Sequence, residues 1–139
     1  MWSFVQNKKQ QAWQWLAISR RTRQVVAYVV GKRTLRNCRK LWKALPYRYR
    51  KAQAYSDFWK AYKKVWGSSV TQVGKDSGQT SYIERFNGTL RQRLAQFVRR
   101  TLSFSKCWKK HLLRLELFLH RYNLDRARNL RLYGTPFGR

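Results

Sequence analysis

Apolar residues follow two patterns along the chain, with short strand-like runs in the first third and mainly helical spacing later. Polar and basic turns at 6–11 and 20–23 separate the first three runs, which predict an antiparallel meander. Two further short runs predict a fourth and a fifth strand. The five predicted strands cover residues 2–5, 12–18, 24–30, 52–56 and 70–73.

Four stretches carry apolar residues three and four positions apart, the spacing of an amphipathic helix. Thr34 is a suitable N-cap for the first of them, and Pro46 lies just past its end. Residues 124–139 are basic and contain two glycines and a proline, so we expect an irregular, flexible tail. The predicted helices cover residues 34–44, 58–66, 80–100 and 106–123.

The order of these elements is three strands, then helix, strand, helix, strand and helix. This is the order of a ribonuclease-H-like α/β fold. We therefore expect one mixed five-stranded sheet, formed by the meander and the two later strands, with flanking helices. A chain of 139 residues suffices for one such domain, which we place at residues 1–123, and is too short for two.

Residues 80–94 combine an apolar stripe with a polar flank. Glu84, Asn87 and Arg91 lie three and four residues apart, so they project together from the predicted helix. An acid, an amide and a guanidinium in this arrangement could hold a metal-bound phosphate. Ser81-x-x-Glu84 also matches a capping box, in which the glutamate satisfies a free backbone donor. The stripe consists of Ile83, Phe86, Leu90, Leu94 and Phe97.

The charge balance points to a partner. Lysine and arginine number 32 against 5 aspartates and glutamates, which gives a formal net charge of +27. Such self-repulsion favours a polyanionic partner, and nucleic acid is the first choice because phosphate binding releases counterions. An anionic membrane is the weaker alternative, since no basic amphipathic segment stands apart from the folded pattern. The hydrophobic fraction of 43% excludes a disordered basic tail.

Other ligand patterns and targeting signals are absent from the sequence. Cys38 and Cys107 match no zinc or redox spacing, and His111 and His120 fall on opposite faces of a helix. The longest apolar run, residues 25–30, is too short to cross a bilayer, and the N-terminus lacks a signal-peptide layout. We therefore expect a cytoplasmic protein with buried thiols.

Two of the acidic residues fall where a ribonuclease-H-like site would use them. In that architecture carboxylates from the first strand, the end of the fourth strand and a later helix converge on two divalent metals. Cleavage of a phosphodiester in such a site relies on metal ions that activate the attacking oxygen and stabilise the leaving oxygen. Carboxylates supply the hard oxygen ligands that suit Mg²⁺ or Mn²⁺. Asp57 follows the fourth strand and Glu84 lies on the later helix, although Asp57 is equally placed as an N-cap. The other acids are Asp76, Glu116 and Asp125.

Several segments resemble the catalytic half of insertion-sequence-one family transposases of the InsB type. The most specific similarity lies in Ile83-Glu84-Arg85-x-Asn87 and in the run Thr-Leu-Ser-Phe-Ser-Lys at 101–106. The similarity spans residues 1–123. The similar segments are residues 1–5, 15–18, 55–62, 73–80, 83–93 and 99–106.

The resemblance implies a DDE mechanism, in which two aspartates and one glutamate bind two Mg²⁺ or Mn²⁺ ions. Water attacks a phosphodiester at the element end, and the freed 3′-hydroxyl then attacks target DNA without a covalent enzyme intermediate. Asp57 would be the second aspartate and Glu84 the glutamate, while Arg91, two helical turns later, would reach DNA phosphate. Further DNA contacts are expected at Asn87, Arg93, Lys75, Arg99 and Arg100.

The resemblance also implies partners and exposes one departure. The partners would be DNA at the element ends and target, a DNA-binding subunit from a partner reading frame, and further copies of the chain, at the bacterial nucleoid. Relatives carry Asp-Glu directly before the residue that matches Met1, and that aspartate is the first of the triad. We therefore expect an N-terminally truncated, inactive transposase fragment. The alternative is a non-catalytic basic protein that binds DNA or RNA.

Overall fold

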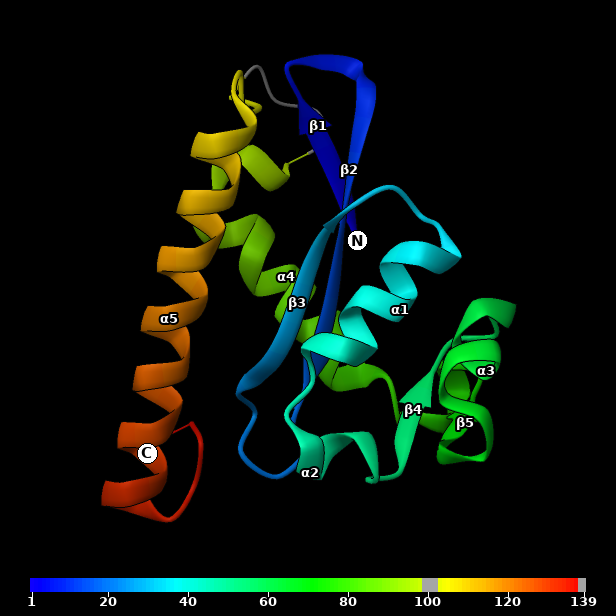
Figure 1. The fold of residues 1–139 in the computed structure, drawn as a ribbon. Coiled ribbons are helices and arrows are strands. Elements are labelled where there is room, and N and C mark those ends of the chain that lie inside the picture. The colour runs from blue at the N-terminus through cyan, green and yellow to red at the C-terminus, as the bar shows by residue number, and fades with distance from the viewer. Residues whose placement is uncertain (99–102, 138–139) are drawn as a thin grey trace.

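The computed structural model describes residues 1–98 and 103–137, and its centre is a three-stranded antiparallel sheet (Figure 1). Strand β2 lies between β1 and β3, so the predicted meander is confirmed. The register pairs Trp2 with Trp13 across the first hairpin. The strands are β1 (Trp2–Val5), β2 (Asn7–Ile18) and β3 (Val25–Gly31).

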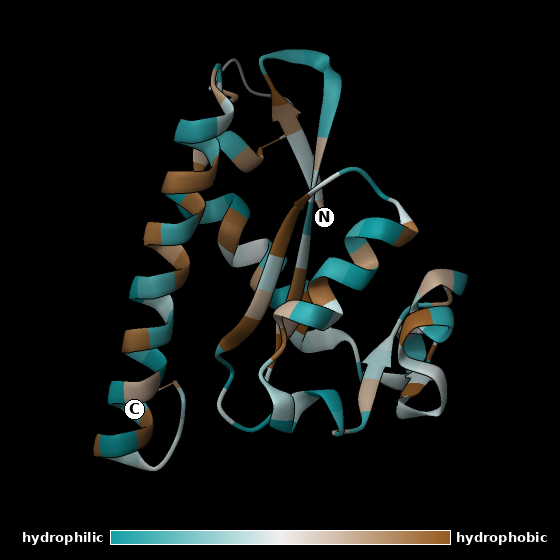
Figure 2. Cartoon of the chain, viewed as in Figure 1, coloured by the Kyte–Doolittle hydropathy of each residue, from teal (hydrophilic) through white to brown (hydrophobic). Residues whose placement is uncertain are grey.

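Strand β2 begins at Asn7, so the predicted polar turn at 6–11 is wrong. Gln6 makes the reversal alone, with a φ of 67°. The Asn7 side-chain oxygen then accepts two backbone N–H groups of the following residues, each at 3.0 Å. The start of β2 is polar because this hairpin projects into solvent, where its tip is hydrophilic (Figure 2). Alternation of apolar residues is therefore missing from a segment that is nevertheless a strand.

The fourth and fifth strands form a separate two-stranded parallel sheet, so the single five-stranded sheet is not formed. The outer edge of β1 instead meets the segment before the last helix. Val5 forms a bridge to Ser105, and the Gln6 N–H donates to the Ser105 carbonyl at 2.7 Å. The α/β class is confirmed, with two sheets. The additional elements are β4 (Ala54–Ser56), α3 (Lys60–Trp66), η1 (Gly67–Ser69) and β5 (Val70–Gln72).

One face of the central sheet packs against α1 (Leu35–Ala44) and α3. Alternation along the strands brings Trp15 and Ala27 to this face, where Cys38 of α1 joins the same core. Burial raises the pKa of the Cys38 thiol to about 11. Cys107, by contrast, is only half-buried, so the expectation of two buried thiols is met by Cys38 alone. A short helix, α2 (Tyr47–Arg50), follows α1.

The opposite face carries α4 (Ser81–Arg93) and α5 (Trp108–Tyr133), with α5 along the outside of the molecule (Figure 1). Leu16 of β2 and Tyr28 of β3 pack into this second core. The apolar stripe of α4 is confirmed as its buried face through Phe86 and Leu90. Both cores are therefore built on the single central sheet.

Helix α4 ends at Arg93 and does not continue to residue 100 as predicted. Leu94 adopts an extended conformation, and the 3-10 turn η3 (Ala95–Phe97) follows. This break redirects the chain so that the Phe97 side chain is fully buried. The core contact therefore survives, although the helix that was expected to provide it has ended.

Helix α5 continues through Tyr133, whereas the prediction ended it near Asn123 and left an irregular tail. Asn123 ties the helix to β3, because its side chain bonds both backbone groups of Val25 at 2.8 Å. Gly134 ends the helix with a φ of 69°, a left-handed conformation that glycine adopts without strain. Among the described residues no helix is both long and apolar enough to cross a bilayer.

Truncation of Phe97 to alanine should destabilise the fold strongly. Its ring is fully buried and packs 5.2 Å from the His111 ring, centroid to centroid. We expect Phe97→Ala to lower the free energy of unfolding by about 3–5 kcal/mol, measured by urea denaturation. Val98→Ala, at an exposed neighbouring position, is the control and should change it by no more than about 0.5 kcal/mol. Equal effects of the two substitutions would contradict this packing.

A closed ring of polar side chains is buried between the sheet, η3 and α5. His111 is fully buried, and its Nε2 atom lies 3.3 Å from the Gln14 amide nitrogen, so Nε2 must accept. Its Nδ1–H then donates to Ser105 Oγ at 3.0 Å. Ser105 donates to Gln96, whose amide donates to the His111 carbonyl. The neutral imidazole therefore has a partner at both ring nitrogens. In the protonated imidazolium, the additional proton on Nε2 would face the Gln14 amide, which is also a donor.

Acid should therefore destabilise the protein through His111. Burial, and secondly the charge of Arg114, lowers the pKa of His111 to about 4 from an unfolded value of 6.5. Because the unfolded chain takes up the proton first, stability is full above pH 6.5 and falls as the pH decreases towards 4. Urea denaturation across this range should show a loss of about 3 kcal/mol. His111→Gln should remove most of this slope, and His120→Gln, at an exposed position, should retain it.

Candidate functional site

Asp57 stands immediately after β4, at the predicted fourth-strand position. Its Oδ1 atom accepts a hydrogen bond from the Trp59 N–H at 3.1 Å, and its backbone carbonyl accepts one from the Gln72 side chain at 3.2 Å. Helix α3 begins later, with Trp59 at the N-cap position, so Asp57 is not the N-cap residue. The local turn fixes the carboxylate while its side chain remains 64% exposed.

The second carboxylate oxygen of Asp57 faces Arg33. The Arg33 Nη2 and Asp57 Oδ2 atoms are 3.9 Å apart. The guanidinium also lies over the rings of Trp13 and Trp59, 5.0 and 5.1 Å from their centroids. Because both charged groups are well exposed, the ion pair adds little stability. The carboxylate thus stays accessible, with an arginine held beside it by aromatic rings.

Glu84 lies in the first turn of α4, but it does not form the predicted capping box. The N-cap position is Thr80, without a side-chain capping bond, and Ser81 is already inside the helix. The Glu84 side chain is exposed and makes no hydrogen bond or ion pair with any described residue. Its negative charge is favourable at a helix N-terminus. The capping interpretation is therefore wrong, and the acid is free for another role.

The flank of α4 that carries Glu84 also carries Asn87 and Arg91, as the spacing predicted. Arg91 is exposed, as is Arg93. Asn87 is half-buried, and its buried Oδ1 atom has no hydrogen-bond partner among the described residues. Among the other predicted DNA contacts, Lys75 begins the turn η2 (Lys75–Ser77), and two lie outside the described residues, Arg99 and Arg100.

Two of the other acids already have partners. Glu116 accepts a hydrogen bond from the Tyr28 hydroxyl, and burial together with this bond raises the pKa of Tyr28 to about 12. Asp125 pairs with Arg121, one helical turn before it, at 3.5 Å. Asp76 lies exposed in η2. The surroundings of Glu116 and Asp125 agree with a structural role for both.

Within the described ranges, no three acidic, histidine or cysteine side chains gather as a metal site. Asp57 and Glu84 offer the hard oxygen donors that Mg²⁺ or Mn²⁺ takes. No hydrogen bond or ion pair joins these two residues. Strands β1 to β3 cannot supply a third carboxylate, because Asp57 is the first acid in the sequence. The residues present therefore do not fit a two-metal site by themselves.

Several arginine side chains stack on aromatic rings, and the sequence pattern alone did not predict these pairs. Among the described residues only Arg33 and Arg121 form ion pairs with a carboxylate, so most guanidinium charges are not neutralised. Basic turns beside aromatic strands were the available sequence signal. Such pairing of cations and rings is typical of nucleic-acid surfaces. Further pairs are Arg20 with Tyr55, Arg23 with Tyr82, Arg48 with Tyr49 and Arg50 with Trp42.

Comparison with known proteins gives a consistent result. The family model described as IS1 transposase matches residues 1–124. The InsB protein of insertion element iso-IS1n from Shigella dysenteriae is 37% identical over 110 residues, which cover 79% of this chain and 82% of that protein. The IS1 InsB protein of Shigella flexneri is 36% identical over the same shares. The IS1 4 InsB protein of Escherichia coli K12 is 34% identical, and the match covers 64% of it. No solved structure matches.

Proposed function

Because the chain belongs to the IS1 transposase family, we propose that it provides the DDE catalytic domain of a DNA transposase, with Asp57 and Glu84 as two of the three carboxylates. The match over residues 1–124 carries this proposal, since it includes both acids. The exposure of both acids and the absence of a capping role for Glu84 support it. The substrates would be the element ends and target DNA.

We also propose that the fold is ribonuclease-H-like. The meander, the helix after it and the parallel β4–β5 pair follow the element order of that fold. Asp57 follows β4, and Glu84 lies on the helix after β5, as that architecture requires. The division into two sheets is the departure from it. Residues 1–123 would form the catalytic domain, although α5 extends beyond this boundary.

DDE transposases generally use divalent metals, which activate the attacking oxygen and stabilise the leaving oxygen. The two carboxylates here supply only part of such a ligand set. The chain's own contribution is to bind and orient DNA through its arginines and aromatic rings, with Arg33 beside Asp57. Further copies of the chain and a DNA-binding subunit would complete the active assembly at the bacterial nucleoid.

A non-catalytic role in binding DNA or RNA is the second candidate. It is favoured by the net charge of +27 and by the lack of a three-residue metal site in the described part of the chain. In that case Asp57 and Glu84 would have no function beyond local structure. The two proposals therefore differ in whether neutralising these two acids abolishes DNA cleavage.

The carboxylates should be dispensable for folding and for binding DNA. Asp57→Asn keeps an oxygen that can accept the Trp59 N–H, and Glu84→Gln removes no contact with a described residue. Both variants should melt near the wild-type temperature and bind plasmid DNA at least as tightly, because a negative charge is lost. Asp125→Asn is the control. Weaker DNA binding by the first two variants alone would contradict this expectation and would indicate that the two acids take part in DNA recognition.

A further inference from the structure

The turn between β2 and β3 is a rigid, strongly basic feature. Ser19 and Gln24 close it through a backbone hydrogen bond of 2.9 Å, and the Arg23 N–H donates to the Ser19 carbonyl at 2.9 Å. The Ser19 hydroxyl accepts the Thr22 N–H at 3.2 Å. Arg23 adopts a left-handed φ of 58°. These bonds fix where the arginine side chains leave the backbone.

Two arginines of this turn reach the two elements that carry the candidate carboxylates. The Arg20 guanidinium lies 4.7 Å from the ring centroid of Tyr55, in β4 and two residues before Asp57. The Arg23 guanidinium lies 3.1 Å from the ring centroid of Tyr82, in α4 and two residues before Glu84. The turn therefore contacts β4 and α4 just before the positions of Asp57 and Glu84.

The Arg23 guanidinium is not satisfied by the protein. Its Nε and Nη1 atoms are buried and have no hydrogen-bond partner among the described residues. The adjacent Arg23 guanidinium, with the charges of Arg20 and Arg85, lowers the pKa of the Tyr82 phenol. Buried donors on a cation without a carboxylate are costly, so an anion placed beside this guanidinium would stabilise its charge.

A cavity of about 100 Å³ lies beside this guanidinium. Arg23 and Arg85 line it, together with the hydroxyl-bearing residues Tyr82 and Thr89. Its lining contains no acidic residue. Two arginines therefore border a small space at the side of α4, and apart from Thr89 the rest of its lining is aromatic or aliphatic.

We propose that Arg23 and Arg85, with Arg20 from the same turn as Arg23, form a phosphate-binding site that holds a phosphodiester of the DNA strand beside β4 and α4. The inference rests on the proposed function, because it assumes that DNA is the ligand. Arginine suits the site because its planar group can stack on a ring and donate several hydrogen bonds at once. A phosphate held here would position the strand along the path between Asp57 and Glu84.

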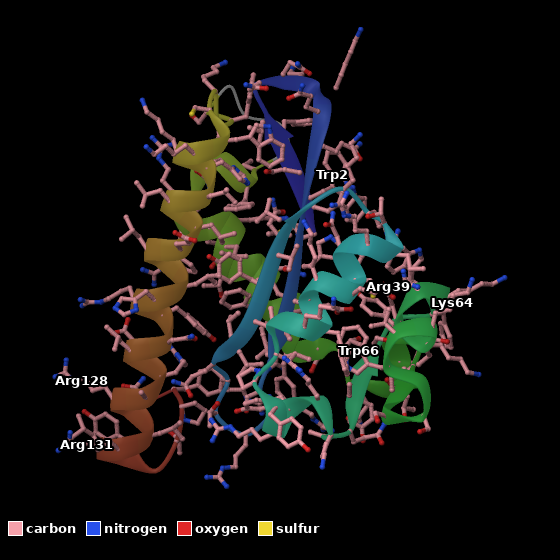
Figure 3. The ribbon with its side chains drawn as sticks, in the orientation of Figure 1. Trp2, Arg39, Lys64, Trp66, Arg128 and Arg131 are labelled. Carbon is pink, nitrogen blue, oxygen red and sulfur yellow. The ribbon has the colours of Figure 1, made fainter. Side chains whose placement is uncertain are left out.

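A charge-preserving substitution separates this site from general electrostatic attraction. Arg23→Lys keeps the net charge but loses the planar fork, so we expect affinity for a short fluorescein-labelled DNA duplex to fall about tenfold. The salt dependence should stay unchanged, because the number of charges is the same. Arg128→Lys is the matched control, since this arginine points away from the body of the molecule (Figure 3), and it should bind like wild type.

Arg85→Lys tests the same cavity without altering the turn, and it should also weaken binding severalfold. Thermal unfolding of each variant checks that the fold is intact. Wild-type affinity in both Arg23→Lys and Arg85→Lys would overturn the phosphate site and leave the proposed function standing. Failure of the wild-type chain to bind DNA at low salt would contradict the proposed function itself.

Discussion

Raising the salt concentration from 50 to 200 mM is expected to weaken DNA binding by about 10³–10⁵-fold, if the chain contacts roughly six to ten phosphates. Each neutralised phosphate releases counterions, and added salt opposes that release. The net charge of +27 and the scarcity of ion pairs among the described residues leave many arginines available for phosphate. Fluorescence anisotropy of a labelled duplex, titrated at several salt concentrations, measures the slope of log affinity against log salt.

The same experiment tests how specific the binding is. Contacts to phosphate carry no sequence information, so duplexes of unrelated sequence should give similar slopes and similar affinities. Arg91→Ala should weaken binding modestly and reduce the slope of log affinity against log salt by about 1, the effect of one lost phosphate contact. An affinity that hardly changes between low and high salt would show that charge does not drive the interaction.

The second large effect concerns cleavage. None of the five acids lies on β1, β2 or β3, whereas the proposed DDE site would need a first-strand aspartate beside Asp57 and Glu84. We expect the 139-residue chain to bind supercoiled plasmid but not to nick it in the presence of Mn²⁺. A chain extended upstream by Asp-Glu and a few apolar residues should nick the same plasmid. Equal nicking by both chains would contradict this prediction and make Asp76 the next candidate ligand.

Local sequence signals were sufficient for most helices and strands. Thr34 accepts a hydrogen bond from the first turn of α1, and the stripe through Phe86 and Leu90 is the buried face of α4. In both cases the residues that determine the helix, through its cap or its apolar stripe, lie within the helix or next to it in the sequence. Short-range physics therefore predicted the meander, the order of elements and the positions of both acids after β4 and on α4.

Features that depend on distant contacts were harder to predict. The start of β2 carries no apolar alternation, because pairing with β1 and not burial makes it a strand. The end of α5 was misplaced because the basic residues 124–139, with two glycines and a proline, were interpreted as an irregular tail. The helix in fact continues to Tyr133, and Asn123 anchors it to β3. The separation of β4 and β5 from the central sheet could not be read from the order of elements.

The candidate site shows the same limit. Spacing placed Glu84, Asn87 and Arg91 on one flank of a helix, and the structure agrees. The stacking of Arg23 on Tyr82 joins residues far apart in the sequence, so no local pattern could reveal it. The capping box failed for a smaller reason, because the helix starts one residue earlier than the motif assumed.

The most direct test of the catalytic assignment is Mn²⁺-dependent plasmid nicking by the upstream-extended chain and its acid variants. Asp57→Asn and Glu84→Gln should each abolish nicking while DNA affinity and melting temperature stay at the level of the unsubstituted extended chain. Asp125→Asn removes an acid that pairs with Arg121 and should nick normally. Full nicking by Asp57→Asn or Glu84→Gln would contradict the assignment of these two carboxylates to the active site.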